Sequence, residues 1–210
     1  MKDLVILAAD KDLEHAMKGL LARPAALGTR AVEADIFVEP QHDPACAQRG
    51  VEFISNFSRQ YQHGLLMFDH AGSGMETIGS GALQESLNDR LSRSAWGERA
   101  RTIVLAPELE VWIWNDSPHV DEAAGWKNRN PGLRPWLIDN GWLQEGEIKP
   151  ARPKEAFNQA LRAARKPRSA SLYEQIAKRV SLRRCKDEAF LELKGILSQW
   201  FPAIPAGSER

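Results

Sequence analysis

The stretch Gly64-Leu65-Leu66-Met67-Phe68-Asp69-His70-Ala71-Gly72-Ser73-Gly74 carries the clearest structural signal in this chain. Four apolar residues end at an acid, and a glycine-rich turn follows. This pattern is typical of a buried parallel strand that delivers a carboxylate to the edge of its sheet. Because open α/β sheets bind their ligands at the carboxyl edge, Asp69 is the first candidate for a functional residue, as a ligand of a metal ion such as Mg²⁺.

A second stretch, Ala106-Pro107-Glu108-Leu109-Glu110-Val111-Trp112, follows the apolar run 102–106. We expect that run to be a strand, which would bring acid to the same edge. The residues after it fit a strand, in which Glu108 and Glu110 share a face, or a helix, in which they point about 200° apart and only one reaches the edge. We favour the helix, because a proline followed by acids is typical of a first helical turn.

Apolar runs alternate with helical patterns over the first half of the chain. This alternation predicts an α/β fold with a mostly parallel sheet and helices on both faces. The expected strands are Leu4–Ala9, Ala31–Val38, Leu65–Phe68 and Thr102–Ala106. The expected helices run from Asp12, as N-cap, to Pro24, from Ala45 to Tyr61 and from Gly81 to Ala95. We expect Asp10 and Asp69 at the carboxyl ends of neighbouring strands.

The last part of the chain is expected to be helical. A segment rich in Asn, Gly, Pro and Trp, with one short helix at 131–140, leads to a linker that contains Gly146. Three helical patterns follow: Lys154–Arg165, a second that opens with the capping box Ser171-Leu172-Tyr173-Glu174, and Asp187–Trp200. We therefore divide the chain into an α/β core, residues 1–146, and a basic helical extension, residues 151–201, packed on or beside that core.

The composition, 43% hydrophobic and 27% charged in 210 residues, is that of a globular protein. No stretch approaches the roughly 20 apolar residues that span a bilayer, and the first apolar run is too short for a signal peptide. We expect a cytoplasmic protein without a membrane partner. Cys46 and Cys185 lack the spacing of a disulfide framework or a zinc site.

Charge is distributed unevenly along the chain. Residues 1–148 hold 14 Lys and Arg against 22 Asp and Glu, whereas residues 149–186 hold 12 against 2. Basic side chains at this density suit the phosphates of DNA or RNA, although the segment could instead dock on the acidic body or on an acidic partner. The residues expected to bind nucleic acid are Arg162, Arg165, Lys166, Arg168, Lys178, Arg179, Arg183 and Arg184.

The order of these features resembles a known family. Leu4-Val5-Ile6-Leu7-Ala8-Ala9-Asp10, Phe68-Asp69-His70-Ala71-Gly72 and Pro107-Glu108-Leu109-Glu110-Val111-Trp112 are similar to segments of the Toprim-related proteins of bacterial defence islands. The tail residues Tyr173, Glu174, Ser181, Cys185, Phe190 and Leu193 are similar to the C-terminal helices of a Toprim-like family. Within that group the chain most resembles a small component of the methylation-associated antiphage defence systems.

The resemblance implies a Toprim-like, Rossmannoid sheet with a Mg²⁺ site at its edge. Toprim sites use a glutamate after the first strand as acid/base and an Asp-x-Asp after the third strand to hold Mg²⁺. Here Ala9 stands at the glutamate position and Ala71 at the second aspartate. The implied site is degenerate, with Asp10 and Asp69 as metal ligands and Glu108 and Glu110 as catalytic groups.

Our leading hypothesis is a component of a prokaryotic antiphage defence system that binds nucleic acid, partner subunits, or both, with a weak Mg²⁺ site. Two alternatives remain open. The chain is an active Mg²⁺-dependent nuclease in which Glu108 or Glu110 takes the role of the lost glutamate. Or it senses a nucleotide through the turn from Gly72 to Gly81, whose amides could wrap a phosphate.

Overall fold

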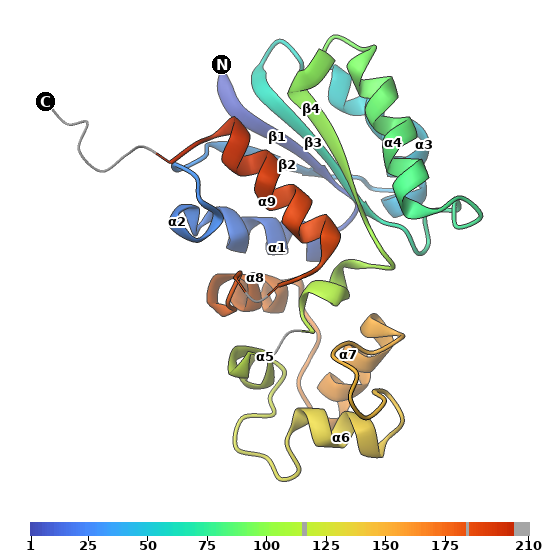
Figure 1. The fold of residues 1–210 in the computed structure, drawn as a ribbon, viewed down its shortest axis with the longest axis vertical. Helices are drawn as coiled ribbons and strands as arrows, with labels where there is room; N and C mark the ends of the chain where they lie inside the picture. The colour runs from blue at the N-terminus through green and yellow to red at the C-terminus, as the bar shows by residue number, and fades with distance from the viewer. Residues whose placement is uncertain (115–116, 184, 204–210) are drawn as a thin grey trace, which may run out of the picture.

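A computed structural model describes residues 1–114, 117–183 and 185–203, and shows a four-stranded sheet between layers of helices (Figure 1). The strands are β1 (Lys2–Ala8), β2 (Ala34–Val38), β3 (Tyr61–Asp69) and β4 (Ala100–Leu105). They lie in the order β2-β1-β3-β4, and every neighbouring pair is parallel. The predicted α/β class with a mostly parallel sheet is therefore confirmed. Asp10 and Asp69 follow or end neighbouring strands, as expected.

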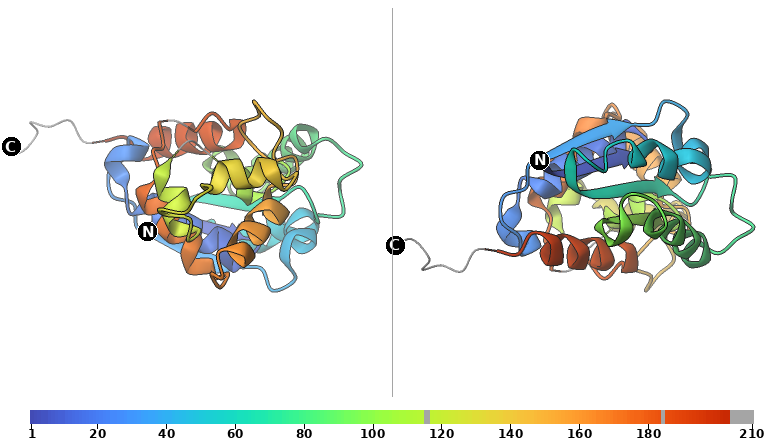
Figure 2. Two further views of the ribbon diagram at one scale, coloured as in Figure 1. Left: turned by 90° about the horizontal axis from the view of Figure 1, so that it is seen from below. Right: turned by 90° about the horizontal axis from the view of Figure 1, so that it is seen from above.

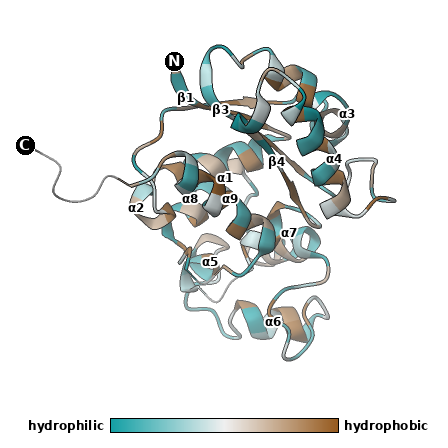
Figure 3. Ribbon diagram, turned by 45° about the horizontal axis from the view of Figure 1, so that its top comes forward, coloured by the Kyte–Doolittle hydropathy of each residue, from teal (hydrophilic) through white to brown (hydrophobic). Residues whose placement is uncertain are grey.

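Helices cover both faces of the sheet. They include α1 (Lys11–Leu21), α2 (Pro24–Leu27), α3 (His42–Ser55), α4 (Ser80–Ser92), the 3₁₀ turn η1 (Gly97–Arg99) and α9 (Glu188–Trp200). Because side chains alternate along a strand, β1 directs Leu4 and Ile6 into a core with α1 and α9. Val5 and Leu7 enter a second core with α3 and α4. Hydrophobic residues accordingly dominate β4 in Figure 3.

The C-terminal helices share the first of these cores. They are α7 (Pro153–Ala163), α8 (Ala170–Arg179) and α9. Phe157 of α7, Tyr173 of α8 and Leu193 of α9 are buried together with Ile6 of the sheet. Helix α8 packs against α1, and α9 packs against β4. One hydrophobic core is therefore continuous across residue 146.

The segment after β4 is neither a strand nor an α-helix. A cis peptide bond joins Ala106 to Pro107, Glu108 is extended, and the 3₁₀ turn η2 (Leu109–Trp112) follows. Next come α5 (Pro118–Ala123) and α6 (Leu133–Asp139), which with α7 lie nearest to the viewer in the left panel of Figure 2. The Trp114 indole donates a hydrogen bond to the Pro153 carbonyl at 3.0 Å, which ties this segment to α7.

Two of the expected helix caps are wrong. Asp10 rather than Asp12 caps α1, since its Oδ1 accepts a hydrogen bond from the Leu13 amide at 2.8 Å. The capping box at Ser171 does not form, because α8 begins earlier, at Ala170, and Glu174 instead binds His15 and Lys178. The start of α9 is as expected, with Asp187 as N-cap.

Side chains of α4 close the outer edge of β4. The Thr102 amide donates to Asn88 Oδ1 at 2.7 Å, and the Val104 amide donates to Gln84 Oε1 at 2.8 Å. These two amides point away from β3 and would otherwise lack a partner strand. Two amide side chains of one helix therefore bind the free backbone N–H groups of Thr102 and Val104.

The described part of the chain holds no helix long and apolar enough to cross a membrane. Its two cysteines are free thiols, Cys46 buried and Cys185 half-buried.

Two helical glycines give a matched test of how closely α1 and α8 approach. A Cβ added at Gly19 would lie 2.7 Å from both the Ala177 Cβ and the Glu174 carbonyl oxygen, whereas one added at Gly195 of α9 meets nothing within 4 Å. We expect Gly19→Ala to lower the free energy of unfolding by about 1–3 kcal/mol through overpacking. Gly195→Ala should raise it by about 0.5–1 kcal/mol. Urea unfolding measures both, and stabilisation by both would contradict the close contact.

Candidate metal centre

Three carboxylates meet at the carboxyl edge of the sheet. Asp69 ends β3, and Glu108 and Glu110 follow β4. One oxygen of each lies within 4.8 Å of the other two. The residues are only 6%, 9% and 1% exposed, respectively. Carboxylate oxygens are the ligands of hard divalent cations, so this buried acidic triad could bind a metal ion.

The 3₁₀ turn explains why both glutamates reach the edge. The Leu109 amide donates to Asp69 Oδ1 at 2.9 Å, which fixes η2 against the end of β3. Glu108 is extended immediately before the turn, and its Oε1 accepts a hydrogen bond from the Lys154 amide at 2.8 Å. The expectation that only one glutamate would reach the edge is therefore wrong, because an extended residue followed by a tight turn is neither of the two alternatives considered.

Glu110 has one satisfied oxygen and one that lacks a partner. Its Oε1 accepts a hydrogen bond from the Tyr173 hydroxyl at 2.5 Å and another from Arg168 at 3.4 Å. Its Oε2 is buried and has no hydrogen-bond partner among the described residues. Leaving a buried polar atom without a hydrogen-bond partner destabilises the fold by about 1–3 kcal/mol, and by more when the group is charged. Oε2 is therefore the atom of the triad that most needs a cation.

Two cations from the basic segment face the triad. Lys154 Nζ lies 3.8 Å from Asp69 Oδ2 and 3.9 Å from Glu108 Oε2, which are ion-pair rather than hydrogen-bond distances. Arg168 pairs with Asp12 as well as with Glu110. For these two residues the geometry is that of docking on the acidic body.

The other residues expected to bind nucleic acid do not converge on the triad. Lys178 pairs with Glu174, and Arg179 lies 3.6 Å from Glu122. Arg162, Arg165 and Arg183 are exposed, and Lys166 is half-buried. Arg184 lies outside the described residues.

Further acids surround the triad without joining it. Asp10 lies at the same edge as the cap of α1. Asp43, in the first turn of α3, accepts a hydrogen bond from the Asp69 amide at 2.8 Å. Sequence reasoning missed Asp43, although an acid in the first helical turn after β2 must lie at this edge. It also missed Lys154 and Tyr173, whose helices follow the strands by many residues and carry no local signal.

The electrostatics of the centre favour proton or cation uptake. Burial, followed by the charges of Asp43 and Glu110, raises the pKa of Asp69 well above its usual range. Burial is also the main cause of the raised pKa of Glu108 and of Glu110. Burial alone would lower the pKa of Lys154, but the surrounding carboxylates outweigh it and raise that pKa. Lys154 therefore stays charged, but its single positive charge does not balance the negative charges of the acids around it.

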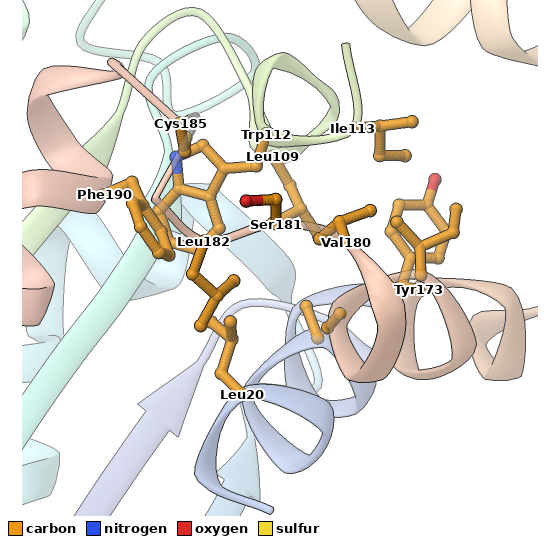
Figure 4. Close-up of a pocket in the computed structure, with 13 residues that line it drawn as sticks. Leu20, Leu109, Trp112, Ile113, Tyr173, Val180, Ser181, Leu182, Cys185 and Phe190 are labelled. Carbon is orange, nitrogen blue, oxygen red and sulfur yellow. The ribbon is translucent and has the colours of Figure 1, made fainter. Parts of the chain in front are cut away.

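An apolar cavity of about 40 Å³ backs the centre on the side of α1 and α8 (Figure 4). Leu20, Leu109, Trp112 and Phe190 line it, together with Tyr173, the residue that binds Glu110. None of the three carboxylates lines this cavity, and Tyr173 connects it with Glu110.

The raised pKa values predict that the metal-free protein loses stability as pH rises. Between the ordinary and the raised carboxyl pKa values, the folded chain binds more protons than the unfolded chain. The contribution of the triad is therefore fully stabilising below that range and is lost as pH rises through it. Surface acids such as Asp3 and Asp35, whose pKa values are lowered, give the opposite slope. The contribution of Glu110 to the pH dependence of stability must therefore be measured by comparing a Glu110 variant with the wild type.

In urea unfolding with a chelator, we expect Glu110→Gln to be more stable than the wild type at about pH 8, with an advantage that shrinks towards about pH 4.5. A variant that is less stable than the wild type at every pH would contradict a raised pKa for Glu110.

The glycine-rich turn before α4 already holds an anion. Gly72 and Gly74, both with positive φ, donate their amides to Glu76 Oε1 at 2.7 and 3.2 Å. A phosphate in this turn would have to displace that carboxylate.

Comparisons of the chain with models of protein families, with curated proteins and with solved structures found no match.

Proposed function

We propose that this chain holds a divalent cation at Asp69, Glu108 and Glu110 and binds the phosphates of nucleic acid at that ion, as a Toprim-like component of a prokaryotic antiphage defence system. The observation that carries the metal site is the buried, unpaired Oε2 of Glu110 within the triad. The defence role, and partner subunits of such a system, are supported by the sequence resemblance alone.

Magnesium is the cation that suits this donor set best. All three ligands are carboxylates, which hard cations prefer, and the candidate group contains no Cys or His. Mg²⁺ keeps several of its waters, so a few protein carboxylates at a sheet edge are sufficient. Asp10 lies near enough for its charge to raise the pKa of Asp69, and we assign it to the outer shell of the ion.

The two cations beside the triad are suited to the phosphate that the metal would bind. The side chains of Lys154 and Arg168 are 35% and 38% exposed, respectively, so each borders both the buried carboxylates and solvent. A phosphate oxygen bound to the metal would meet these two groups, which offset its negative charge.

Metal-dependent binding of an oligonucleotide tests this function. We expect wild-type protein to bind a fluorescein-labelled DNA of about 20 nucleotides at least about tenfold more tightly with Mg²⁺ than with EDTA, a difference of about 1.4 kcal/mol. Glu110→Gln should lose the difference, whereas Glu155→Gln, at an exposed position next to Lys154, should keep it. Equal affinities with Mg²⁺ and with EDTA in the wild type would overturn the proposal.

An active nuclease is the second candidate, and one observation favours it. Both glutamates reach Asp69, so the triad supplies the carboxylates that Ala9 and Ala71 do not. We expect such an enzyme to nick supercoiled plasmid with Mn²⁺ and to lose this activity in Glu108→Gln and Glu110→Gln. Nucleic-acid binding without nicking would leave the first candidate.

A further inference from the structure

A basic groove lies away from the acidic triad. It has a volume of about 450 Å³ and is lined by residues of three segments: Arg23 to Gly28 around α2, Ser181 to Arg183 before α9, and Lys194 of α9. Arg23 follows the carboxyl-terminal end of α1, whose other end carries Asp10. Since α1 has 11 residues, the groove lies roughly 16 Å from the edge that holds the triad.

The groove gathers positive charge without a compensating acid. Arg23, Arg183 and Lys194 line it, and none of its lining residues is acidic. Within the described part of the chain, none of these three cations lies within ion-pair distance of a carboxylate, in contrast to Lys178 and Arg179. Three like charges in one groove repel one another, and a bound anion would relieve that repulsion.

Arg23 is fixed in place rather than free in solvent. Its Nη1 donates hydrogen bonds to the carbonyls of Ala177 and Val180, both at 2.8 Å, at the end of α8. The guanidinium has five N–H donors, and one of its nitrogens makes both of these bonds. The remaining donors of a half-buried arginine are thus positioned at the groove without further loss of side-chain freedom.

We propose that this groove binds the phosphate groups of a nucleic-acid strand. Planar guanidinium groups and an ammonium are the usual partners of phosphate oxygens, and the Ser181 hydroxyl adds a neutral donor. The groove is several times larger than one phosphate, and its cations come from three segments, which fits a strand better than a single ion. The ligand class is that of the proposed function, but the groove needs no metal.

The test is binding of a fluorescein-labelled single-stranded DNA of about 20 nucleotides, in EDTA, at several salt concentrations. We expect Arg183→Glu/Lys194→Glu to weaken binding at least about tenfold and to reduce the slope of log K against log[salt] by about 1.4, as for two lost contacts to a single strand. The control is Arg93→Glu, which reverses one exposed charge at the C-cap of α4, and it should change affinity less than about twofold. Arg23 is left intact because it caps α8.

Each outcome has a definite meaning. Equal weakening by the control and the double variant would show a general charge effect and overturn the groove, as would an unchanged slope. A melting curve for each variant excludes unfolding as the cause. If the wild type binds DNA only with Mg²⁺, the proposal that the groove binds DNA is rejected and the metal proposal is supported. If binding in EDTA is lost in the double variant but kept in Glu110→Gln, the groove stands independently of the triad. A melting temperature raised by inorganic pyrophosphate in a protein that binds no DNA would reject a strand as the ligand.

Discussion

A chain that ends at Gly146 is expected not to fold. The missing helices bury Phe157, Phe190, Leu193 and Leu197 against the sheet and α1, and each of these side chains is at most 2% exposed. Burial of one such side chain stabilises a fold by about 1.5–3 kcal/mol, so the loss of the set rivals the whole stability of a typical domain, about 5–15 kcal/mol. Far-ultraviolet circular dichroism and urea unfolding of the truncated chain measure the effect.

The control interrupts the chain at the same place without removing the helices. Gly146 is exposed and has a positive φ in a turn, so a short Gly-Ser insertion after it should leave the fold intact. A truncated chain with a cooperative transition would show that residues 1–146 are an independent domain after all.

Manganese is expected to raise the melting temperature of the metal-free protein by about 5–10 °C. A cation at about 100 times its dissociation constant stabilises the folded state by about 2.7 kcal/mol, and in a chain of this size each kcal/mol corresponds to about 2–4 °C. Asp69→Asn and Glu110→Gln should each abolish most of the shift, because each removes a ligand of the buried triad. Scanning calorimetry with and without Mn²⁺ gives the result directly.

The shift, rather than the melting temperature, is the quantity to compare, since Glu110→Gln is expected to be stabilised without metal. Asp139→Asn removes an exposed acid on α6 and should keep the full shift. An unchanged melting temperature of the wild type with millimolar Mn²⁺ or Mg²⁺ would overturn the metal proposal and leave Lys154 as the cation of the centre.

The strands were predictable from their short apolar runs, but their starts were not: β3 begins at Tyr61, which was expected to end the preceding helix. The pairing of β1 with β3 also follows the expectation that Asp10 and Asp69 end neighbouring strands. Helix boundaries were less predictable, because a cap depends on which of two nearby acids the backbone reaches. Asp10 and Asp12 both fit the start of α1, and only the structure shows that Asp10 binds the Leu13 amide.

The candidate centre was predictable in its acids and not in its cations. The sequence indicates the acids because Asp69, Glu108 and Glu110 follow apolar runs. Lys154 and Arg168 approach from helices and loops far along the chain, and nothing in their local sequence indicates which acids they pair with. The C-terminal helices were expected on or beside the core, but their exact place was not predictable: the amphipathic pattern of α9 shows that one face is buried, but not that the sheet itself covers it.

The closed edge of β4 limits how this protein can assemble with others. Strand addition, whether between two copies of a chain or with an extended peptide, requires main-chain donors that are free on an edge strand. At β4 these donors are already engaged by Asn88 and Gln84, so a partner strand would first have to break two hydrogen bonds. A complex formed on this side of the molecule would therefore be built from side chains of helices and loops, and the protein is protected there from edge-to-edge aggregation.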